Sequence, residues 1–213
     1  MKPPRLFLAD DHPVVIAGLR KLLEPQFEIV GTAEDGRELV RLAPLLRPDV
    51  ILLDISMPLL NGLSAARQIR KLMPGARMIF LTMHADIDYV KEAFRAGASG
   101  YILKRSVASE MIFAIEEVLR GKTYLTPVIA AGFHGPLPAP SDEGADAGNE
   151  LTQRQREVLQ LLAEGHTGKE IAALLHVTVQ TVEYHKAAIR KKLHLRTTAE
   201  LVAYAIQHKM TGE

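Results

Sequence analysis

The chain has 213 residues, a formal net charge of +1 and no cysteine. Without cysteine it can form no disulfide, no thiolate zinc site and no cysteine nucleophile. No apolar stretch approaches the roughly 20 residues that span a bilayer. Because the chain is long for a single hydrophobic core, we expect two domains in a soluble, cytoplasmic protein with no membrane partner.

Charge is unevenly distributed along the chain. Residues 1–120 carry 16 Lys and Arg against 15 Asp and Glu, residues 121–150 carry 1 against 4, and residues 151–213 carry 9 against 6. The last segment is therefore basic. That surplus suggests an anionic partner, although a surplus of three charges is a weak signal by itself.

The segment from Thr126 to Asn149, "TPVIAAGFHGPLPAPSDEGADAGN", contains four prolines and four glycines and has no regular hydrophobic period. Such a composition is typical of a linker. We therefore predict a first domain over residues 1–122, a linker over 123–149 and a second domain over 150–213. An alternative is that Pro127 to Phe133 forms a short helix packed on the first domain.

Two periodicities alternate within the first domain. Stretches with helical spacing separate five short apolar runs, which are "LFLA" (6–9), "FEIVGTA" (27–33), "VILLD" (50–54), "RMIFLT" (77–82) and "GYILK" (100–104). Alternating strands and helices indicate βαβ units, and strands that are apolar throughout belong in a parallel sheet covered by helices on both faces. The prediction is an α/β domain with a doubly wound (βα)5 fold and a five-stranded parallel sheet.

Polar side chains stand at the ends of four predicted strands. Asp10 and Asp11 follow the first strand, Asp54 the third, Thr82 the fourth and Lys104 the fifth. Ligands of open α/β sheets bind beyond the carboxyl ends of the strands, so these side chains are expected to converge at one mouth. Adjacent carboxylates such as Asp10 and Asp11 repel each other, which favours a cation between them.

This constellation favours phosphoryl chemistry with Mg²⁺. Carboxylate oxygens suit a hard cation that often binds together with phosphate. Asp54 is the candidate nucleophile, because it stands alone on the central strand, and Thr82 and Lys104 could hold the oxygens of the resulting acyl phosphate. An Asp after a strand is more often a helix cap, but five such residues at appropriate strand ends are hard to explain as caps.

The motifs "ADDH", "DVILLDISMPLLNG", "LTMHAD" and "GYILKR" resemble the receiver domain of two-component response regulators, over residues 5 to about 120. The resemblance implies the following roles: Asp54 as phosphoacceptor, Asp10, Asp11, Asp54 and the Ser56 carbonyl as Mg²⁺ ligands, Thr82 and Tyr101 as the switch pair, and Lys104 as the cation that contacts the phosphoryl group. One departure is Arg105, where most receivers have Pro or an acidic residue.

The second domain has unusually explicit helix starts. Thr152, Thr167 and Thr197 are each followed three positions later by Gln or Glu, which is the spacing of a capping box. A fourth start at Thr178 has Thr181 where the acid would stand. Because no acid competes for the free N–H groups there, this helix end is open to a phosphate.

The helix that begins after Thr178 has an outward face and follows a shorter helix from Lys169 to Leu175, with a tight turn between them. This order indicates a helix-turn-helix, although a small helical bundle with a solvated outer face remains an alternative. The outward face is formed by Gln180, Glu183, Tyr184, Ala187, Arg190 and Lys191, with Lys186 on the flank.

The stretch from Leu151 to Leu193 looks like the four-helix output domain of the NarL/FixJ (LuxR-type) regulators. The resemblance assigns DNA-backbone contacts to Thr181, His185 and the basic end of the helix. It assigns base contacts to the outward residues Glu183, Tyr184 and Ala187. The full set of predicted DNA contacts is Lys169, Thr181, Glu183, Tyr184, His185, Lys186, Ala187, Arg190 and Lys191.

One helix-turn-helix touches few bases, so adequate specificity calls for two copies on a repeated DNA site. The last helix, "AELVAYAIQH", has small and apolar residues on more than one face. We therefore predict a homodimer in the active state, with Leu201 and Tyr204 as candidate contacts.

The resulting hypothesis is a response regulator, not an enzyme, that accepts a phosphoryl group from a sensor histidine kinase on Asp54 and then binds double-stranded DNA to control transcription. RNA polymerase is a further candidate partner. One alternative is a DNA-binding regulator that works without phosphorylation. Another is a Mg²⁺-dependent phosphohydrolase, against which stands the absence of the Asp-x-Asp arrangement of aspartyl-nucleophile phosphatases.

Overall fold

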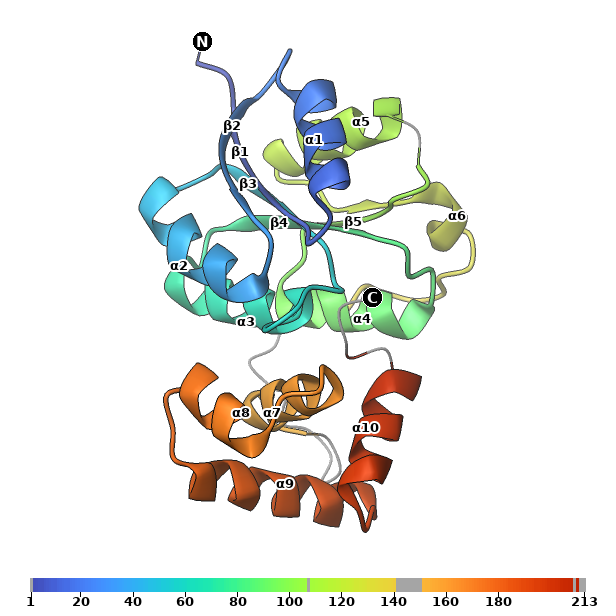
Figure 1. Ribbon diagram of the computed structural model, residues 1–213. Helices are drawn as coiled ribbons and strands as arrows, with labels where there is room; N and C mark the ends of the chain where they lie inside the picture. The colour runs from blue at the N-terminus through green and yellow to red at the C-terminus, as the bar shows by residue number, and fades with distance from the viewer. Residues whose placement is uncertain (1, 107, 141–150, 209, 211–213) are drawn as a thin grey trace.

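The computed structural model describes residues 2–106, 108–140, 151–208 and 210, and it contains a parallel sheet domain above a helical domain (Figure 1). All strand pairs of the sheet are parallel, in the order β2-β1-β3-β4-β5-β6. The strands are β1 (Arg5–Ala9), β2 (Glu28–Ala33), β3 (Val50–Leu53), β4 (Arg77–Thr82), β5 (Gly100–Leu103) and β6 (Tyr124–Leu125).

Helices cover both faces of the sheet, as the apolar strands predicted. Helices α1 (Pro13–Leu23) and α5 (Ala108–Leu119) share one hydrophobic core with the sheet. Helices α2 (Gly36–Leu46), α3 (Gly62–Leu72) and α4 (Ile87–Ala96) share the other. Burial on both faces explains why the central strands β3 and β5 contain no exposed residue. The doubly wound α/β fold is confirmed.

The strand count differs from the prediction by one. The sixth strand, β6, extends the sheet beyond β5, because the amide of Tyr124 donates to the Ser99 carbonyl at 3.1 Å and that of Thr126 to the Tyr101 carbonyl at 3.0 Å. Two residues are too few to show an alternating pattern, which is why the sequence did not reveal them.

The short helix α6 (Pro127–Ala130) follows β6, and Ile129 is buried in the core that the sheet shares with α4. The alternative of a short helix packed on the first domain is therefore the arrangement observed. The later part of the predicted linker, residues 141–149, lies outside the described residues.

The helical domain consists of α7 (Gln153–Ala163), α8 (Gly168–Leu174), α9 (Val179–Leu193) and α10 (Thr198–Gln207) around a third core. All three predicted capping boxes form, at the starts of α7, α8 and α10. At the start of α9, Thr178 caps alone by accepting from the Thr181 amide at 3.1 Å. The turn between α8 and α9 contains His176 with a positive φ of 52°.

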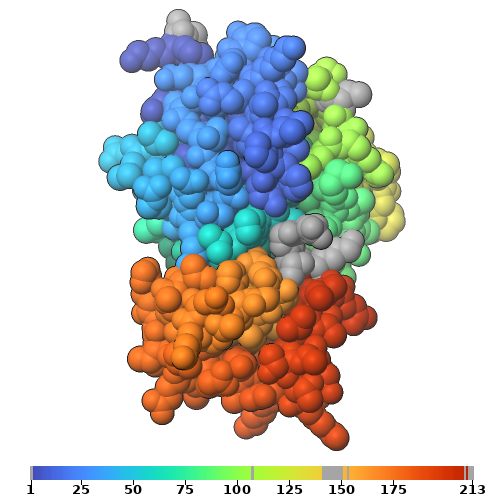
Figure 2. Space-filling model, in the orientation of Figure 1, coloured from blue at the N-terminus to red at the C-terminus, as the bar shows by residue number. Residues whose placement is uncertain are grey.

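The two domains are in contact (Figure 2). Helices α7, α8 and α10 lie toward α3 and α4 of the sheet domain, and α9 lies on the far side of the helical domain (Figure 1). Within the described part of the chain, no helix combines the length and the apolar character that crossing a membrane requires.

Candidate functional site

Three of the predicted side chains meet at the carboxyl end of the sheet. The ammonium of Lys104 lies 2.6 Å from a carboxylate oxygen of Asp10 and 2.7 Å from one of Asp54. Both carboxylates are almost completely buried, at 1% and 5% exposure. The position follows from topology, because β1, β3 and β5 are parallel and therefore end on the same side of the sheet.

Electrostatics in this cluster is governed by burial and by Lys104. Burial raises the pKa of Asp54, and the ammonium of Lys104 partly offsets this rise. Burial would lower the pKa of Lys104, but its hydrogen bonds to Asp10 and Asp54 outweigh burial, and its pKa is raised. The lysine therefore carries its charge between two carboxylates, while a desolvated Asp54 oxygen retains the basicity that a nucleophile needs.

The predicted switch residues border the cluster. Thr82 is completely buried, and its hydroxyl accepts from the amide of His84 at 3.3 Å. Tyr101 is also buried and donates from its hydroxyl to the His84 carbonyl at 2.8 Å. The hydroxyl of Ser56 lies 3.0 Å from Nε2 of the same histidine. His84 thus contacts all three residues, which the sequence alone did not indicate.

The acidic residues fit a hard cation. Oxygen ligands are the kind that Mg²⁺ prefers, and Asp10, Asp11 and His12 offer ligand atoms within 4.8 Å of one another. Oxygen Oδ1 of Asp11 is buried and accepts no hydrogen bond from any described residue, although Nδ1 of His12 lies 2.7 Å away. A cation bound here would compete with His12 for this carboxylate oxygen.

The candidate DNA-binding face of α9 is open to solvent. Glu183, Tyr184, Ala187 and Lys191 are exposed, Tyr184 by 71%. Thr181, His185, Lys186 and Arg190 are partly buried on its flanks, and Lys169 is exposed on α8. The face lies away from the sheet domain (Figure 1), so the contact between the domains leaves it uncovered.

Two electrostatic details qualify the individual roles on α9. Burial, together with the nearby charge of Arg154, lowers the pKa of His185, so that this side chain is a neutral hydrogen-bonding group at pH 7. The ammonium of Lys186 lies 2.7 Å from the carboxylate of Glu183. Glu183 therefore has an internal partner that a base donor such as cytosine N4 would have to replace.

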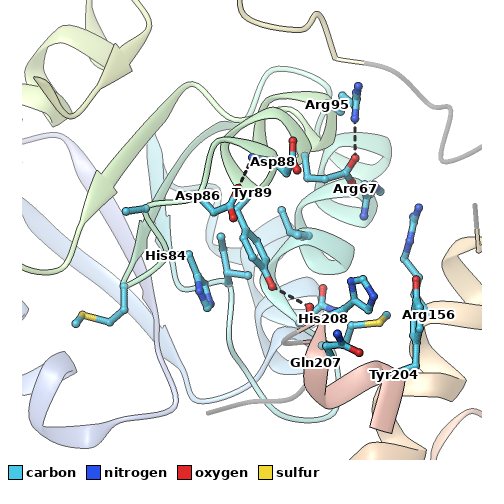
Figure 3. A pocket seen from close by; sticks show the side chains of 17 residues that line it. Arg67, His84, Asp86, Asp88, Tyr89, Arg95, Arg156, Tyr204, Gln207 and His208 are labelled. Atoms are coloured by element: carbon cyan, nitrogen blue, oxygen red, sulfur yellow. Dashed lines mark hydrogen bonds and ion pairs between the residues drawn. The ribbon is translucent and has the colours of Figure 1, made fainter. Parts of the chain in front are cut away.

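The prediction that Leu201 is a dimer contact is wrong for this structure. Leu201 is completely buried in the helical core, because its apolar period serves packing within the domain. Tyr204 is partly buried, and its ring lies close to that of His208, with ring centroids 4.1 Å apart and the ring planes tilted by 35°. It lines a cleft between the two domains, where α10 approaches α4 (Figure 3).

This interdomain cleft has a volume of about 720 Å³ and contains contacts that the sequence did not reveal. Tyr89 points across it and donates from its hydroxyl to the His208 carbonyl at 2.8 Å (Figure 3). Further along the boundary, Gln160 of α7 binds the backbone of Met57 and Asn61. No local sequence signal marks these residues, because their partners are about 100 positions away in the chain.

Known proteins of similar sequence span nearly the whole chain. The transcriptional regulatory protein MctR of Rhizobium johnstonii is 37% identical over 98% of this chain and 96% of MctR. The oxygen regulatory protein NreC of Staphylococcus carnosus is 38% identical over 97% of this chain and 98% of NreC. The solved RcsB response regulator of Salmonella typhimurium has 26% sequence identity and a TM-score of 0.65, over 97% of this chain and 98% of RcsB.

An α/β domain with a buried carboxylate–lysine cluster, joined to a helix-turn-helix domain, defines a two-component response regulator. Residues 6–116 match the response regulator receiver domain, and residues 149–205 match the LuxR family of bacterial regulatory proteins. The chain belongs to the NarL/FixJ family of response regulators, which join a receiver domain to a LuxR-type DNA-binding domain and control transcription.

Proposed function

We propose that Asp54 is the residue that receives the phosphoryl group, and that the donor is a phosphohistidine of a sensor kinase. The boundaries we propose are 1–122 for the receiver, 123–149 for the connecting segment and 150–213 for the DNA-binding domain. The connecting segment begins with β6 and α6, which pack on the receiver. In the transfer step, a carboxylate oxygen of Asp54 forms a bond to phosphorus as the P–N bond breaks, and the kinase imidazole leaves with the electron pair and takes up a proton.

The neighbouring side chains stabilise the charge on the transferred group. Lys104 already lies 2.7 Å from Asp54, so its ammonium can contact a phosphoryl oxygen with little movement. We propose that the hydroxyl of Thr82 turns from the His84 amide toward the phosphoryl group, and that Tyr101 then gives up its bond to the His84 carbonyl. Tyr101 and Thr82 would in this way report the state of Asp54.

We propose Mg²⁺ as the cofactor, held by the carboxylates of Asp10, Asp11 and Asp54 and by the Ser56 carbonyl. When bound, the ion would neutralise charge on the phosphoryl oxygens. The grouping of carboxylate oxygens from Asp10 and Asp11 within 4.8 Å of one another supports this assignment.

For the DNA-binding domain we propose contacts through α9 and the formation of homodimers on DNA. The exposed face of α9 supports the first proposal. Solved structures of RcsB include a DNA complex and two RcsB dimers on two parallel DNAs, which supports both. We further propose that RNA polymerase is a downstream partner and that the chain has no catalytic turnover of its own beyond accepting the phosphoryl group.

The observation that carries the proposal is the contact of Lys104 with both Asp10 and Asp54 in a buried cluster. The test is incubation of the full chain with acetyl phosphate and Mg²⁺, followed by intact mass measurement. The wild type is expected to gain one phosphoryl group, whereas Asp54→Asn and chelation of Mg²⁺ are expected to prevent the gain. Labelling of Asp54→Asn at the wild-type rate would refute the assignment.

A second candidate, regulation without phosphorylation, has one observation in its favour. The face of α9 is open to solvent and lies away from the receiver, so contact with DNA does not require the two domains to separate. Binding of Asp54→Asn to a target DNA, compared with phosphorylated wild type, separates the two candidates. Equal affinity and equal cooperativity would favour the second.

A further inference from the structure

The short strand β6 ends before the carboxyl end of its neighbour β5. The pairing of the two strands stops at Tyr101 and Leu125, although β5 continues to Leu103. The amides on the β6 side of β5 therefore lose their strand partner just before Lys104, the lysine of the buried carboxylate–lysine cluster. A buried amide without a partner costs free energy, so another group is needed to satisfy this edge of the sheet.

The side chain of Thr126 takes the place of the missing strand residue. Its hydroxyl oxygen accepts from the Leu103 amide at 3.3 Å, and the same hydroxyl donates to the Tyr101 carbonyl at 3.4 Å. The backbone amide of Thr126 donates to that carbonyl as well, at 3.0 Å. Thr126 is 4% exposed, so water has little access to these bonds. One threonine therefore binds β5 on both sides of Ile102.

Thr126 is itself fixed by the helix that follows it. Its carbonyl accepts from the amides of Ile129 and Ala130, at 2.9 and 3.0 Å, where the first turn of α6 begins. Ile129 is buried in the core that the sheet shares with α4, which anchors this turn. A threonine at a helix N-cap usually bonds to an amide of its own helix. Within the described part of the chain, the Thr126 hydroxyl makes no such capping bond and serves β5 instead.

Lys104 is held by hydrogen bonds on both edges of β5. On the β4 side, the amide of Lys104 donates to the Thr82 carbonyl at 2.8 Å. On the β6 side, the preceding amide, that of Leu103, donates to Thr126. Adjacent amides are thus bound from opposite edges, which fixes the backbone from which the lysine side chain extends. Its ammonium lies 2.7 Å from a carboxylate oxygen of Asp54.

We propose that Thr126 is a positioning residue for phosphoryl transfer, which fixes the end of β5 and thereby the ammonium of Lys104 against Asp54. This inference rests on the proposed function of Asp54. A group that stabilises transition-state charge must be placed within a fraction of an ångström, so a looser β5 end weakens its effect. Thr126 bonds to the backbone of β5 and acts through Lys104. The start of the connecting segment therefore contributes to the chemistry of the receiver.

The test uses the full chain with Thr126→Val, which keeps the shape of the side chain and removes the hydroxyl. The rate of phosphoryl gain from acetyl phosphate and Mg²⁺, followed by intact mass, is expected to fall roughly two- to tenfold, as the net loss of one or two hydrogen bonds implies. Thr126→Ser keeps a hydroxyl and is expected to react at nearly the wild-type rate. Ile129→Val is the matched control, because it removes a buried methyl group of the same segment and no hydrogen-bonding group.

Combination with Lys104→Met shows whether Thr126 acts through the lysine. If it does, Thr126→Val slows the transfer in the wild-type background and has no further effect in Lys104→Met. Equal slowing in both backgrounds would refute the proposal, because the hydroxyl would then support only the fold. An unchanged rate in Thr126→Val, or equal slowing by Ile129→Val, would refute it as well.

Hydrogen exchange of a peptide covering residues 101–106 separates this inference from the assignment of Asp54. Exchange is expected to be faster in Thr126→Val than in wild type or Ile129→Val, and equal exchange in all three would refute the positioning role whatever happens at Asp54. If wild type gains no phosphoryl mass, the assignment of Asp54 fails and the role in transfer fails with it. Thr126→Cys, whose thiol is a weak donor and acceptor, keeps the test decisive if Thr126→Val does not fold.

Discussion

Tyr89 of α4 and His208 beyond α10 are joined by a 2.8 Å hydrogen bond from the tyrosine hydroxyl to the histidine carbonyl (Figure 3). The ring of Tyr89 also stacks on that of His84 at 4.4 Å, and His84 contacts Ser56, Thr82 and Tyr101. A continuous set of contacts therefore leads from the candidate acceptor site to the last helix of the DNA-binding domain.

Tyr89→Phe should loosen the contact between the domains, because it removes the hydroxyl and keeps the stacked ring. We expect the equilibrium constant between docked and separated domains to shift toward separation roughly two- to tenfold. Small-angle scattering of the full chain should show this as a larger radius of gyration. Tyr124→Phe is the control, since that hydroxyl donates to Glu110 within the receiver at 3.2 Å. Identical scattering of wild type and Tyr89→Phe would contradict this expectation.

The same pair predicts a pH dependence. Burial raises the pKa of Tyr89 to about 12, so the protonated hydroxyl is favoured in the docked state. The protonated Tyr89 hydroxyl therefore stabilises the docked state fully below the ordinary tyrosine pKa of about 10. This stabilisation is lost as the pH rises toward 12. The scattering difference between wild type and Tyr89→Phe should therefore be constant up to about pH 10 and shrink above it.

Lys104→Met should destabilise the receiver and increase its response to Mg²⁺. Removing the ammonium leaves the buried Asp10 and Asp54 carboxylates facing each other, at a cost of about 3 kcal/mol in unfolding free energy. A cation would offset part of that repulsion, so Mg²⁺ should raise the melting temperature of the variant more than that of wild type. Lys122→Ala is a suitable control, because the Lys122 side chain is exposed and pairs with Glu117 rather than with Asp10 or Asp54. A variant that melts like wild type without Mg²⁺ would argue against a strained carboxylate pair.

Local patterns in the sequence were sufficient for most of the fold. The apolar runs and the polar residue after each run are local features, and Asp10, Asp54 and Lys104 do meet as the strand ends predicted. Capping boxes are equally local, since Thr197 and Glu200 contact each other within one helical turn. The functional roles of these residues stay predictions.

Features that depend on distant packing could not be predicted. Gln160 is a polar residue on an amphipathic helix and would be expected in solvent, but a loop about 100 positions earlier buries it. Leu201 shows the opposite ambiguity, because an apolar residue on a helix can serve its own core or a second copy. Periodicity alone does not distinguish these cases. In this structure Leu201 packs in the core of its own domain.

Gly62→Ala should disrupt the loop between β3 and α3, whereas Gly18→Ala should leave the fold intact. The added Cβ at Gly62 would meet backbone atoms of Asp54, and backbone cannot move aside as a flexible side chain can. We expect a loss of at least about 2 kcal/mol in unfolding free energy. A Cβ at Gly18, inside α1, would meet no described atom within 4 Å. Alanine at this helical position should raise the unfolding free energy by as much as about 1 kcal/mol. Chemical denaturation of both variants measures the difference, and equal stabilities would contradict the close approach at Asp54.

Lys191 and Glu183 should affect DNA binding in different ways, because one can contact phosphates and the other is proposed to read a base. Lys191→Ala should weaken binding to all sequences and reduce the salt dependence by about one unit of slope, while Lys21→Ala on α1 should leave both unchanged.

Glu183→Ala should change the preferred base at one position of each half-site. It should also free Lys186, whose ammonium lies 2.7 Å from Glu183, and so raise affinity for unrelated DNA. Binding to a randomised half-site library at two salt concentrations separates these effects. A uniform rise in affinity with no change in base preference would mean that Glu183 faces the DNA backbone and that the base-reading face of α9 is rotated from the one proposed.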